Sequence, residues 1–286
     1  MIRTVGIVSK PIKDVVCSVV PPLLAWLRER RIEAIIDKET QACIDTGTSS
    51  VSRASIAEHA DLLMVFGGDG TLLSAARALG GSNVPILAVN LGALGFLTSV
   101  TLDELYPVLE QVLAGKHHTS ERMMLEAAVY HDGIAGHFHS ALNDAVVNKS
   151  AMARMLDFDV SIDQNHVGRY RADGLIVATP TGSTAYSLAA GGPIVHPDLD
   201  ALVITPICPH MLTNRPLVIA GSARVEMDFS AAEEPVYLTL DGQTGVQLKA
   251  KDRITVTKSP YKVKLVRPMG KTYFEILRSK LRWGER

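Results

Sequence analysis

A buried apolar run that ends in a glycine-rich turn constrains the fold of this chain more than any other feature. Residues 62–66 (Leu-Leu-Met-Val-Phe) carry no polar side chain, which is typical of a parallel strand covered on both faces. The turn at residues 67–71 (Gly-Gly-Asp-Gly-Thr) follows at once, and residues 72–76 begin a helical pattern. The sequence therefore predicts a strand–turn–helix corner, the unit from which α/β folds with parallel sheets are built.

This corner suits a bound phosphate group. Backbone N–H groups and the positive end of the helix dipole meet there, and Gly68 and Gly70 let the backbone approach a bulky anion. Asp69 is unexpected in such a place, because a carboxylate repels phosphate unless it binds a metal ion or removes a proton. Both roles occur in phosphoryl transfer. The alternative is that Asp69 only caps the helix and that the glycines only form the turn.

Strands and helices alternate through the first two-fifths of the chain. The alternation predicts a Rossmann-like parallel sheet with helices on both faces. Residues 39–55 are polar and rich in Ser and Thr, so we expect a mobile loop beside the site. Apolar spacing over residues 14–30 predicts a helix that begins near Pro21 and Pro22. The other expected elements are strands at residues 5–8, 32–36, 62–66 and 86–89 and a helix at residues 102–113.

After about residue 120 the pattern is mostly β. Short strands separated by turns such as Asp163-Gln164-Asn165 and Asp241-Gly242 favour an antiparallel β-sandwich. The basic amphipathic segment 272–283 is expected to form a helix that packs back on the first domain. The predicted strands are residues 124–130, 137–142, 156–162, 167–171, 175–178, 217–219, 223–227, 236–240 and 254–258.

These patterns predict two domains. The first is an α/β domain of residues 1–120 together with the returning tail 266–286, and it carries the glycine-rich turn. The second is a β-rich, sandwich-like domain of residues 121–265. A length of 286 residues is by itself compatible with two domains or with one large domain.

Composition excludes several classes of protein. The net charge of -1 argues against a protein that is held on nucleic acid by bulk electrostatics. No apolar run reaches the roughly 18 residues of a membrane span, and the chain opens directly into a strand without a visible signal peptide. The cysteines are far apart and form no CxxC pair, which predicts a reducing cytoplasmic location without disulfides or a zinc site.

A second conspicuous stretch, residues 173–193, lies in the β-rich part. An apolar strand runs into a turn and a short helix that ends at Gly191-Gly192. Hydroxyl groups are dense in this turn, and they are able to bond ribose, base or phosphate. The alternative is that they cap the helix, although one cap does not need so many. These residues are Thr181, Ser183, Thr184, Tyr186 and Ser187.

The chain resembles the ATP-dependent NAD kinases, and in particular their bacterial members. The resemblance covers nearly the whole chain, and its most specific parts are residues 173–193 and residues 90–97 (Asn-Leu-Gly-Ala-Leu-Gly-Phe-Leu). The glycine-rich turn alone is a weak signal, because diacylglycerol-type lipid kinases and phosphofructokinases carry similar turns. The family often has Asn-Glu where this chain has Asn143-Asp144, which is expected to alter the reach of the carboxylate rather than the function. Residues 209–212, 215–216 and 241–243 also match the family.

The resemblance implies a reaction and its participants. The γ-phosphoryl group of ATP would pass to the 2′-hydroxyl of the adenosine ribose of NAD, giving NADP and ADP, with Asp69 as the general base. Mg²⁺ or another divalent cation would be held mainly by the nucleotide phosphates, because no metal-ligand cluster is readable in the sequence. NAD and ATP are the expected partners, without nucleic acid or membrane, and the family forms homodimers or homotetramers.

The resemblance also implies a set of binding residues. Asn143 and Asp144 would grip ribose hydroxyls, with a simple Asx turn as the alternative, and Asn90 and Phe96 would line the NAD pocket. Arg154 and Arg171 are candidates for holding phosphate oxygens, although a solvated surface charge explains either of them nearly as well. The remaining expected contacts are Gly68, Gly70, Thr71, Asp173, Thr184, Ala185, Tyr186, Ser187, Leu188, Ala189 and Gln243.

Two other classes of protein share parts of this pattern. A lipid or sugar kinase would need an apolar groove or more basic residues, and neither is evident. A non-catalytic dinucleotide sensor would gain nothing from a carboxylate near phosphate, so Asp69 argues against it. Parallel sheets place ligands where their strands end, and the second cluster lies in the β-rich part. We therefore expect the active site in the cleft between the two domains.

Overall fold

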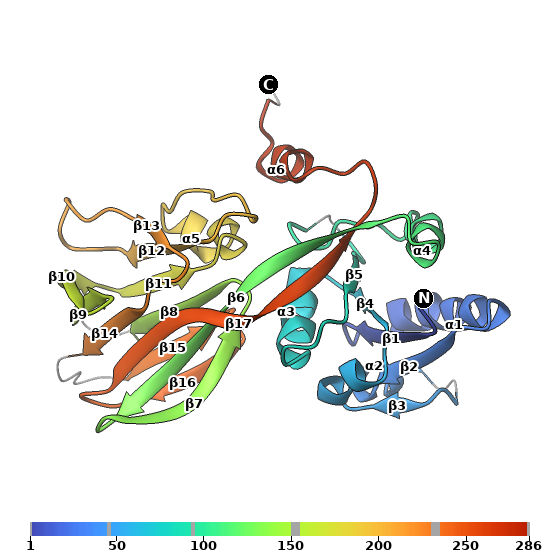
Figure 1. Cartoon of the computed structure of the whole chain (residues 1–286), viewed down its shortest axis with the longest axis horizontal. Helices are drawn as coiled ribbons and strands as arrows, with labels where there is room; N and C mark the ends of the chain where they lie inside the picture. Colours follow the sequence, from blue (N-terminus) through green and yellow to red (C-terminus); the bar gives the residue numbers. More distant parts are fainter. Residues whose placement is uncertain (1, 45–46, 93–94, 150–154, 230–234, 285–286) are drawn as a thin grey trace. The chain divides into compact units, whose positions relative to one another are not determined.

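The computed structural model describes residues 2–44, 47–92, 95–149, 155–229 and 235–284 (Figure 1). The chain divides into two compact units, one made of Met1–Glu121 with Val263–Arg286 and the other of Arg122–Lys262. It passes between the units twice, within the long strands β6 (His118–His131) and β17 (Arg253–Arg267). The first unit is therefore discontinuous in sequence.

The first unit is built on a parallel sheet. Its strands follow the order β5–β4–β1–β2–β3, and the end of β17 adds a parallel partner to β5 through Leu265 and Ile86. Every position of the central strand β4 is buried, as its uninterrupted apolar sequence predicts. The expected Rossmann-like sheet is confirmed. The strands are β1 (Thr4–Ser9), β2 (Glu33–Asp37), β3 (Ser50–Val51), β4 (Leu62–Phe66) and β5 (Ile86–Val89).

The first long helix corrects one prediction. Helix α1 (Lys13–Glu29) contains Pro21 and Pro22 in its interior instead of beginning at them. Two prolines remove two backbone hydrogen bonds, but the helix buries a continuous apolar face that offsets this loss. That face consists of Val16, Val20, Leu23, Leu24 and Leu27.

Residues 39–55, which the sequence predicted to be a loop, contain regular structure where they are described. Helix α2 (Lys38–Gln41) extends into this region, β3 follows, and the 3-10 helix η1 (Arg53–Glu58) begins in it. Asp37 accepts a hydrogen bond from the Thr40 amide at 3.0 Å, which caps α2, and Arg53 donates to the same carboxylate at 2.6 and 2.8 Å. The prediction was wrong because polar composition suggested solvation, whereas these polar groups bond one another.

The second unit is an antiparallel β-sandwich, as the sequence predicted. One sheet contains β10–β9–β14–β17 with β6 and β7, and the other has the order β13–β12–β11–β8–β15–β16. The core between them includes Phe158, Leu175 and Leu238. The strands are β7 (Ile134–Ala141), β8 (Asp144–Lys149), β9 (Leu156–Ile162), β10 (Asn165–Ala172), β11 (Gly174–Ala178), β12 (Ala201–Ile207), β13 (Leu217–Ala220), β14 (Val225–Phe229), β15 (Val236–Leu240) and β16 (Thr244–Leu248).

Turn chemistry in this unit follows the sequence. Asp163 and Gln164, in the two-residue turn between β9 and β10, have positive φ angles of 48° and 66°. Asp241 and Gly242, in the three-residue turn between β15 and β16, have positive φ angles of 51° and 65°, and both turns use the residue types that tolerate this conformation. The second sheet carries the short helices η2 (Gly182–Thr184) and α5 (Tyr186–Ala189) beside it, and Ala190 packs against the apolar cluster that contains Ile176 and Val203 of the sheet. The hydroxyl-rich stretch therefore covers the face of the sheet that lies away from the main core.

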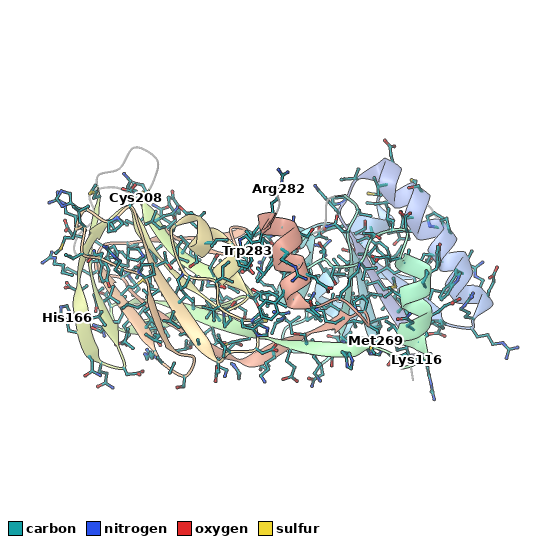
Figure 2. All side chains as sticks on the ribbon, turned by 90° about the horizontal axis from the view of Figure 1, so that it is seen from above. Lys116, His166, Cys208, Met269, Arg282 and Trp283 are labelled. Carbon is teal, nitrogen blue, oxygen red and sulfur yellow. The ribbon has the colours of Figure 1, made fainter. Side chains whose placement is uncertain are left out.

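The C-terminal segment returns to the first unit, which confirms the predicted packing of the tail. Helix α6 (Tyr273–Leu281) begins with a capping box formed by Thr272 and Glu275. Just before it, Lys271 donates to the Ser99 carbonyl at 2.9 Å and to Glu104 at 2.6 Å, next to helix α4 (Leu105–Leu113). Figure 2 shows Arg282 and Trp283 where this helix ends. Among the described residues, no helix has the length and apolar character needed to cross a membrane.

Candidate active site

The predicted strand–turn–helix corner forms where β4 ends. Helix α3 (Asp69–Ala78) starts at Asp69, and Gly68 is its N-cap residue. A side chain at Gly67 would overlap that of Thr71, and Gly67 also has a φ of 158°, so this position requires glycine. Gly68 instead faces open space, where a ligand has room to approach the backbone.

Asp69 does not cap its own helix. Its carboxylate accepts hydrogen bonds from the backbone N–H groups of Phe96 (2.9 Å), Leu97 and Thr98 (both 3.1 Å), which belong to the segment after β5. A side chain at Gly95 would overlap this carboxylate, so glycine is needed there for close contact. The alternative that Asp69 only caps its helix is therefore wrong, because its carboxylate instead holds the backbone of residues 96–98.

A hydrogen-bond chain runs from Asn90 to Asp69. The buried Asn90 amide donates to the Thr98 hydroxyl at 2.7 Å, and that hydroxyl donates to Asp69 Oδ1 at 3.2 Å. Oδ1 thus accepts three donors, whereas Oδ2 accepts only the Phe96 amide among the described residues. Because a carboxylate oxygen has about two lone-pair sites, Oδ2 is the atom with capacity for a further proton donor.

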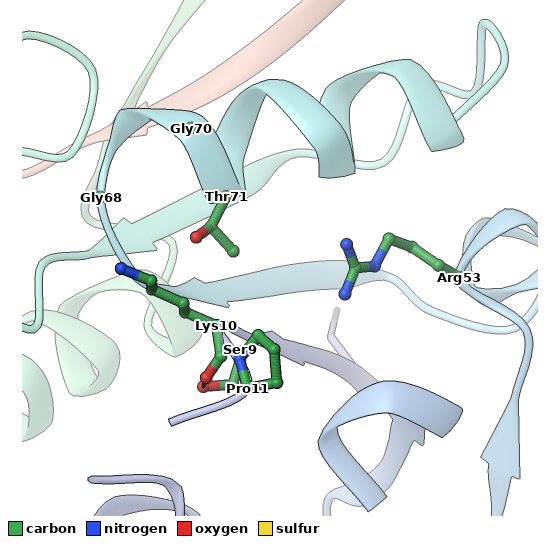
Figure 3. Close-up of a pocket in the computed structure, with 7 residues that line it drawn as sticks. All are labelled: Ser9, Lys10, Pro11, Arg53, Gly68, Gly70 and Thr71. Carbon is green, nitrogen blue, oxygen red and sulfur yellow. Dashed lines mark hydrogen bonds between the residues drawn. The ribbon is translucent and has the colours of Figure 1, made fainter. Parts of the chain in front are cut away.

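A pocket of about 260 Å³ opens beside this corner (Figure 3). Lys10 and Arg53 reach toward it from two directions, and the N-terminus of α3 forms one wall. Arg53 is held in place by Asp37, Glu39 and the Ser74 hydroxyl. Two cations and a helix N-terminus give this pocket the chemistry of a phosphate site. Its described lining residues, none of them acidic, are Ser9, Lys10, Pro11, Arg53, Gly68, Gly70 and Thr71.

The second unit has a pocket of its own, of about 330 Å³. Asp144, Val146 and Asn148 alternate along β8 and therefore point to the same face of the sheet. Carboxyl, amide and hydroxyl groups occur next to the ring of Tyr186, a combination that suits a ribose with its base. The lining residues are Asn143, Asp144, Val146, Asn148, Ala185, Tyr186, Thr239, Asp241 and Gly242.

Asp144 is the electrostatically unusual residue of this pocket. Its side chain is 4% exposed, and burial raises the pKa of its carboxyl to about 7, with a further contribution from the negative charge of Asp241. Asp241 accepts the backbone N–H groups of Leu142 (3.2 Å), Asn143 (2.7 Å) and Asp144 (3.4 Å). Near neutral pH the Asp144 carboxyl therefore exchanges between a donor and an acceptor form.

The hydroxyl-rich stretch divides into internal and pocket-facing groups. Ser187 bonds Thr205 at 2.8 Å, Ser183 donates to the Pro180 carbonyl at 2.6 Å, and Thr184 donates to the Thr181 carbonyl at 3.1 Å. These hydroxyls hold the turn in shape. Tyr186, in contrast, is 44% exposed and lines the pocket with Ala185. A direct contact of Thr184 or Ser187 with substrate stays a prediction.

Several predicted contacts lie outside both sets of lining residues. Asp173 pairs with Lys149 at 3.1 Å, and the backbone carbonyl of Arg171 accepts the His210 amide at 2.8 Å. Gln243 is an exposed residue of the turn after β15, and Leu188 and Ala189 belong to α5. Arg154 lies outside the described residues. Their binding roles remain predictions.

The pockets also contain residues that sequence reasoning missed. Lys10 follows β1, whose parallel pairing with β4 brings it to the edge of the sheet where the glycine-rich turn lies, so the topology was a usable signal. Asn148 lies four positions after Asp144 on β8. Because side chains alternate between the two faces of a strand, Asn148 was predictable on the same face as Asp144. Arg53 gave no such signal, because its position depends on Asp37.

No group of three or more His, Cys, Asp or Glu side chains comes together among the described residues in a way that would hold a metal ion. The acceptor atoms of Asp69 are largely occupied by backbone donors. The expectation that a divalent cation arrives on the nucleotide phosphates therefore stays a prediction.

A phosphate-suited corner on a parallel sheet, together with a polar pocket on a β-sandwich, defines a two-domain enzyme of nucleotide-dependent phosphoryl transfer. The ATP-NAD kinase N-terminal domain model matches residues 5–117, and the ATP-NAD kinase C-terminal domain model matches residues 142–268. The chain belongs to the NAD kinase family. The resemblance is thus confirmed, and the chain is a kinase that phosphorylates NAD with ATP.

Full-length relatives and solved structures agree with this assignment. The chain is similar to a NAD kinase of Geobacter metallireducens, with 53% identity over 92% of this chain and 93% of the relative. It is 46% identical to a NAD kinase of Solibacter usitatus over 100% and 99% of the two chains. Yeast NADH kinase complexed with NADH has a TM-score of 0.90 at 27% identity, covering 99% of this chain and 89% of that one. An NAD kinase from Archaeoglobus fulgidus in complex with ATP has a TM-score of 0.76 at 25% identity, covering 98% of each chain.

Proposed function

We propose that the γ-phosphoryl group of ATP passes to the 2′-hydroxyl of the adenosine ribose of NAD, with Asp69 as the general base. The triphosphate occupies the pocket of the first unit, and the dinucleotide occupies that of the second. The contrast between the two linings carries this proposal: one is cationic with no acidic residue among its described members, and the other presents a carboxyl, amides and an aromatic ring. Related solved kinases bind ATP and NADH, which supports the two ligand classes.

The first pocket provides charge neutralisation for the donor. Lys10 and Arg53 face the phosphate oxygens, and the N–H groups of α3 after Gly68 point at the same position. A divalent cation bound to the triphosphate would supply further neutralisation of the transferring group. Because Arg53 is already oriented by Asp37 and Ser74, it binds the phosphates without a large loss of side-chain entropy.

The second pocket orients the acceptor. Asn143 and Asp144 hold ribose hydroxyls, and the ring of Tyr186 packs against the nucleoside. As the new O–P bond forms and the bond to the β-phosphate oxygen breaks, the 2′-hydroxyl proton passes to Asp69 Oδ2 and ADP leaves. A base in reach of such a proton typically contributes about 10²–10⁴-fold to the rate.

Phosphorus NMR of the reaction products tests this assignment. Incubation of the purified chain with NAD, ATP and magnesium should give NADP phosphorylated at the 2′-oxygen of the adenosine ribose, together with ADP. NADP in place of NAD should give no second transfer, because its 2′-oxygen is already occupied. Transfer to the nicotinamide ribose, or no transfer to any dinucleotide, would contradict the proposal.

The assembly and location of the protein stay predictions. Homodimers or homotetramers in a cytoplasmic location, with neither nucleic acid nor membrane as partners, are what membership of the family suggests. Light scattering on the purified full chain measures the assembly directly.

A further inference from the structure

The corner that carries Asn143 and Asp144 is shaped by a residue from a distant part of the chain. Asp241 lies in the turn after β15, is 8% exposed, and accepts three consecutive backbone N–H groups from Leu142 to Asp144. Its own N–H donates to the Asp144 carbonyl at 3.0 Å. One carboxylate thus fixes the backbone of three successive residues, two of which are the proposed ribose contacts.

The corner is also held by Thr179, the residue that follows β11. The Thr179 hydroxyl donates to the Leu142 carbonyl at 2.7 Å, and the Thr179 N–H donates to the Asn143 carbonyl at 2.8 Å. With N–H groups bound by Asp241 and carbonyls bound by Thr179, the backbone conformation of the corner is determined from both sides. The side chains of Asn143 and Asp144 then extend into the pocket that they line.

Asp241 also acts on Asp144 through its charge. Within the pocket, the titratable side chains beside Asp144 are Asp241 from the turn after β15 and Tyr186 from α5. The strand β11 places Ala178 opposite Asp144, and the lysine on β8, Lys149, pairs with Asp173 at the far end of that strand. The negative charge of Asp241 is the second cause, after burial, of the raised pKa of Asp144.

We propose that Asp241 is a positioning residue for dinucleotide binding. Its carboxylate holds residues 142–144 in the conformation that presents Asn143 and Asp144 to the ribose, and its negative charge opposes the ionised form of Asp144, which accepts a hydrogen bond from a ribose hydroxyl. This inference rests on the proposed function, in which the pocket of the second unit binds NAD. An ionised Asp144 makes a charge-assisted hydrogen bond to a ribose hydroxyl, which is stronger than the bond made by the neutral acid. NAD affinity should therefore increase as pH rises through the pKa of Asp144, near 7.

The experiment measures NAD dissociation constants of the full chain by calorimetry between pH 5 and pH 9. In Asp241→Asn the amide oxygen still accepts the Asn143 and Asp144 N–H groups, but the amide nitrogen faces the Leu142 N–H and the charge is gone. We expect roughly tenfold weaker NAD binding at pH 8, since one buried backbone donor loses its acceptor. We also expect the midpoint of the pH dependence to move below that of the wild type.

Asp252→Asn is the matched control. Asp252 is a buried carboxylate of the same unit that accepts the Lys249 N–H at 2.8 Å and contacts His131 at 2.7 Å, and it lines neither pocket. Its replacement should lower thermal stability, as that of Asp241 does, but should leave the NAD affinity and its pH midpoint as in the wild type. A general loss of packing in the sandwich would instead alter both variants alike.

Asp144→Asn keeps the test decisive if Asp241→Asn fails to fold. With Asp241 intact, the NAD affinity of this variant should no longer change with pH near pH 7. If that change persisted, Asp144 and Asp241 would not control the pH dependence of NAD binding. An unchanged affinity and midpoint in a folded Asp241→Asn protein would overturn the positioning role while leaving the kinase assignment intact. If the wild-type chain phosphorylated NAD but its NAD affinity did not change with pH near pH 7, this inference would be overturned and the kinase assignment would stand. A wild-type chain that neither binds nor phosphorylates NAD would overturn both.

Discussion

The two carboxylate oxygens of Asp69 have different surroundings. Oδ1 binds two backbone amides and the Thr98 hydroxyl, whereas Oδ2 binds the Phe96 amide and retains a free lone-pair site among the described contacts. The sequence drew attention to Asp69 because an acid in a phosphate corner needs a reason. It gave no sign that the acid also fixes the segment after β5, since that contact joins residues almost thirty positions apart.

Replacement of this acid should separate binding from turnover. In Asp69→Asn we expect turnover to fall by about two to four orders of magnitude while NAD affinity changes only a few-fold, because the amide cannot accept the hydroxyl proton. Steady-state kinetics and calorimetry measure the two effects. Thr98→Val is the control: it removes one donor to Oδ1 and the acceptor of the buried Asn90 amide, should lower the free energy of unfolding by about 1–3 kcal/mol, and should leave most of the activity. A near wild-type rate in Asp69→Asn would rule out Asp69 as the base.

Asp144 should make stability depend on pH. Its carboxyl has a pKa of about 7 in the folded chain against 3.8 for the ordinary group, so the folded state binds more protons between these values. The free energy of unfolding should therefore fall as pH rises from about 4 to 7 and stay low above that. From pH 5 to pH 8 the wild type should lose on the order of 2–3 kcal/mol of its free energy of unfolding through this group, and Asp144→Asn should not lose it. Urea unfolding at both pH values measures this, and parallel pH profiles of the two proteins would contradict it.

At the scale of elements, apolar patterns predicted most of the core strands but missed β12, which is buried along its whole length, and they predicted little of what polar groups build. The strands β4, β5, β9 and β15 match their predicted bounds, because each is an uninterrupted or alternating apolar run. Strand β8 was missed because it follows the polar corner Asn143-Asp144, and α2 was missed because its residues read as a solvated loop. Both elements depend on partners that are distant in sequence, namely Asp241 for the corner and Arg53 for Asp37.

Helix η2 packs closely against Asn143, the residue before β8 that lines the pocket of the second unit. A methyl group at Gly182 would overlap the backbone of Asn143, so Gly182→Ala must displace the corner. We expect a loss of about 1–3 kcal/mol in the free energy of unfolding and weaker NAD binding, since Asn143 moves with the corner. Gly245→Ala, on β16, is the control because a methyl group there contacts nothing within 4 Å. Equal stability and NAD affinity of the two variants would show that the backbone at Asn143 accommodates the methyl group without loss of stability or binding.

At the scale of the whole molecule, the sequence predicted both architectures and the return of the tail. It did not predict the anchor of that tail, in which Lys271 bonds Ser99 and Glu104, because a single lysine in a basic segment carries no information about its partner. The two pockets also divide between the units: the phosphate-suited pocket belongs to the first and the ribose-suited pocket to the second. Neither unit alone contains the full set of proposed contacts.

Separation of the units should therefore abolish phosphoryl transfer while leaving weak binding of NAD. Expressed alone, residues 122–262 should bind NAD weakly and show no turnover, because they retain Asn143, Asp144 and Tyr186 but lack Asp69 and Lys10. Calorimetry with NAD and a coupled assay with ATP measure the two properties, with circular dichroism to verify folding and the full chain as the reference. Wild-type turnover by this fragment would show that the first unit is not needed for the reaction.

The discontinuity of the first unit has a consequence for the synthesis of the protein. Its sheet is completed by Leu265 pairing with Ile86, about 180 residues earlier in the chain, and its last helix is α6. A ribosome thus exposes the glycine-rich corner long before the strand and helix that complete its unit, whereas the sandwich emerges as one continuous stretch. In the nascent chain the second unit should therefore fold before the first, because the first is completed only after residues 263–286 have emerged.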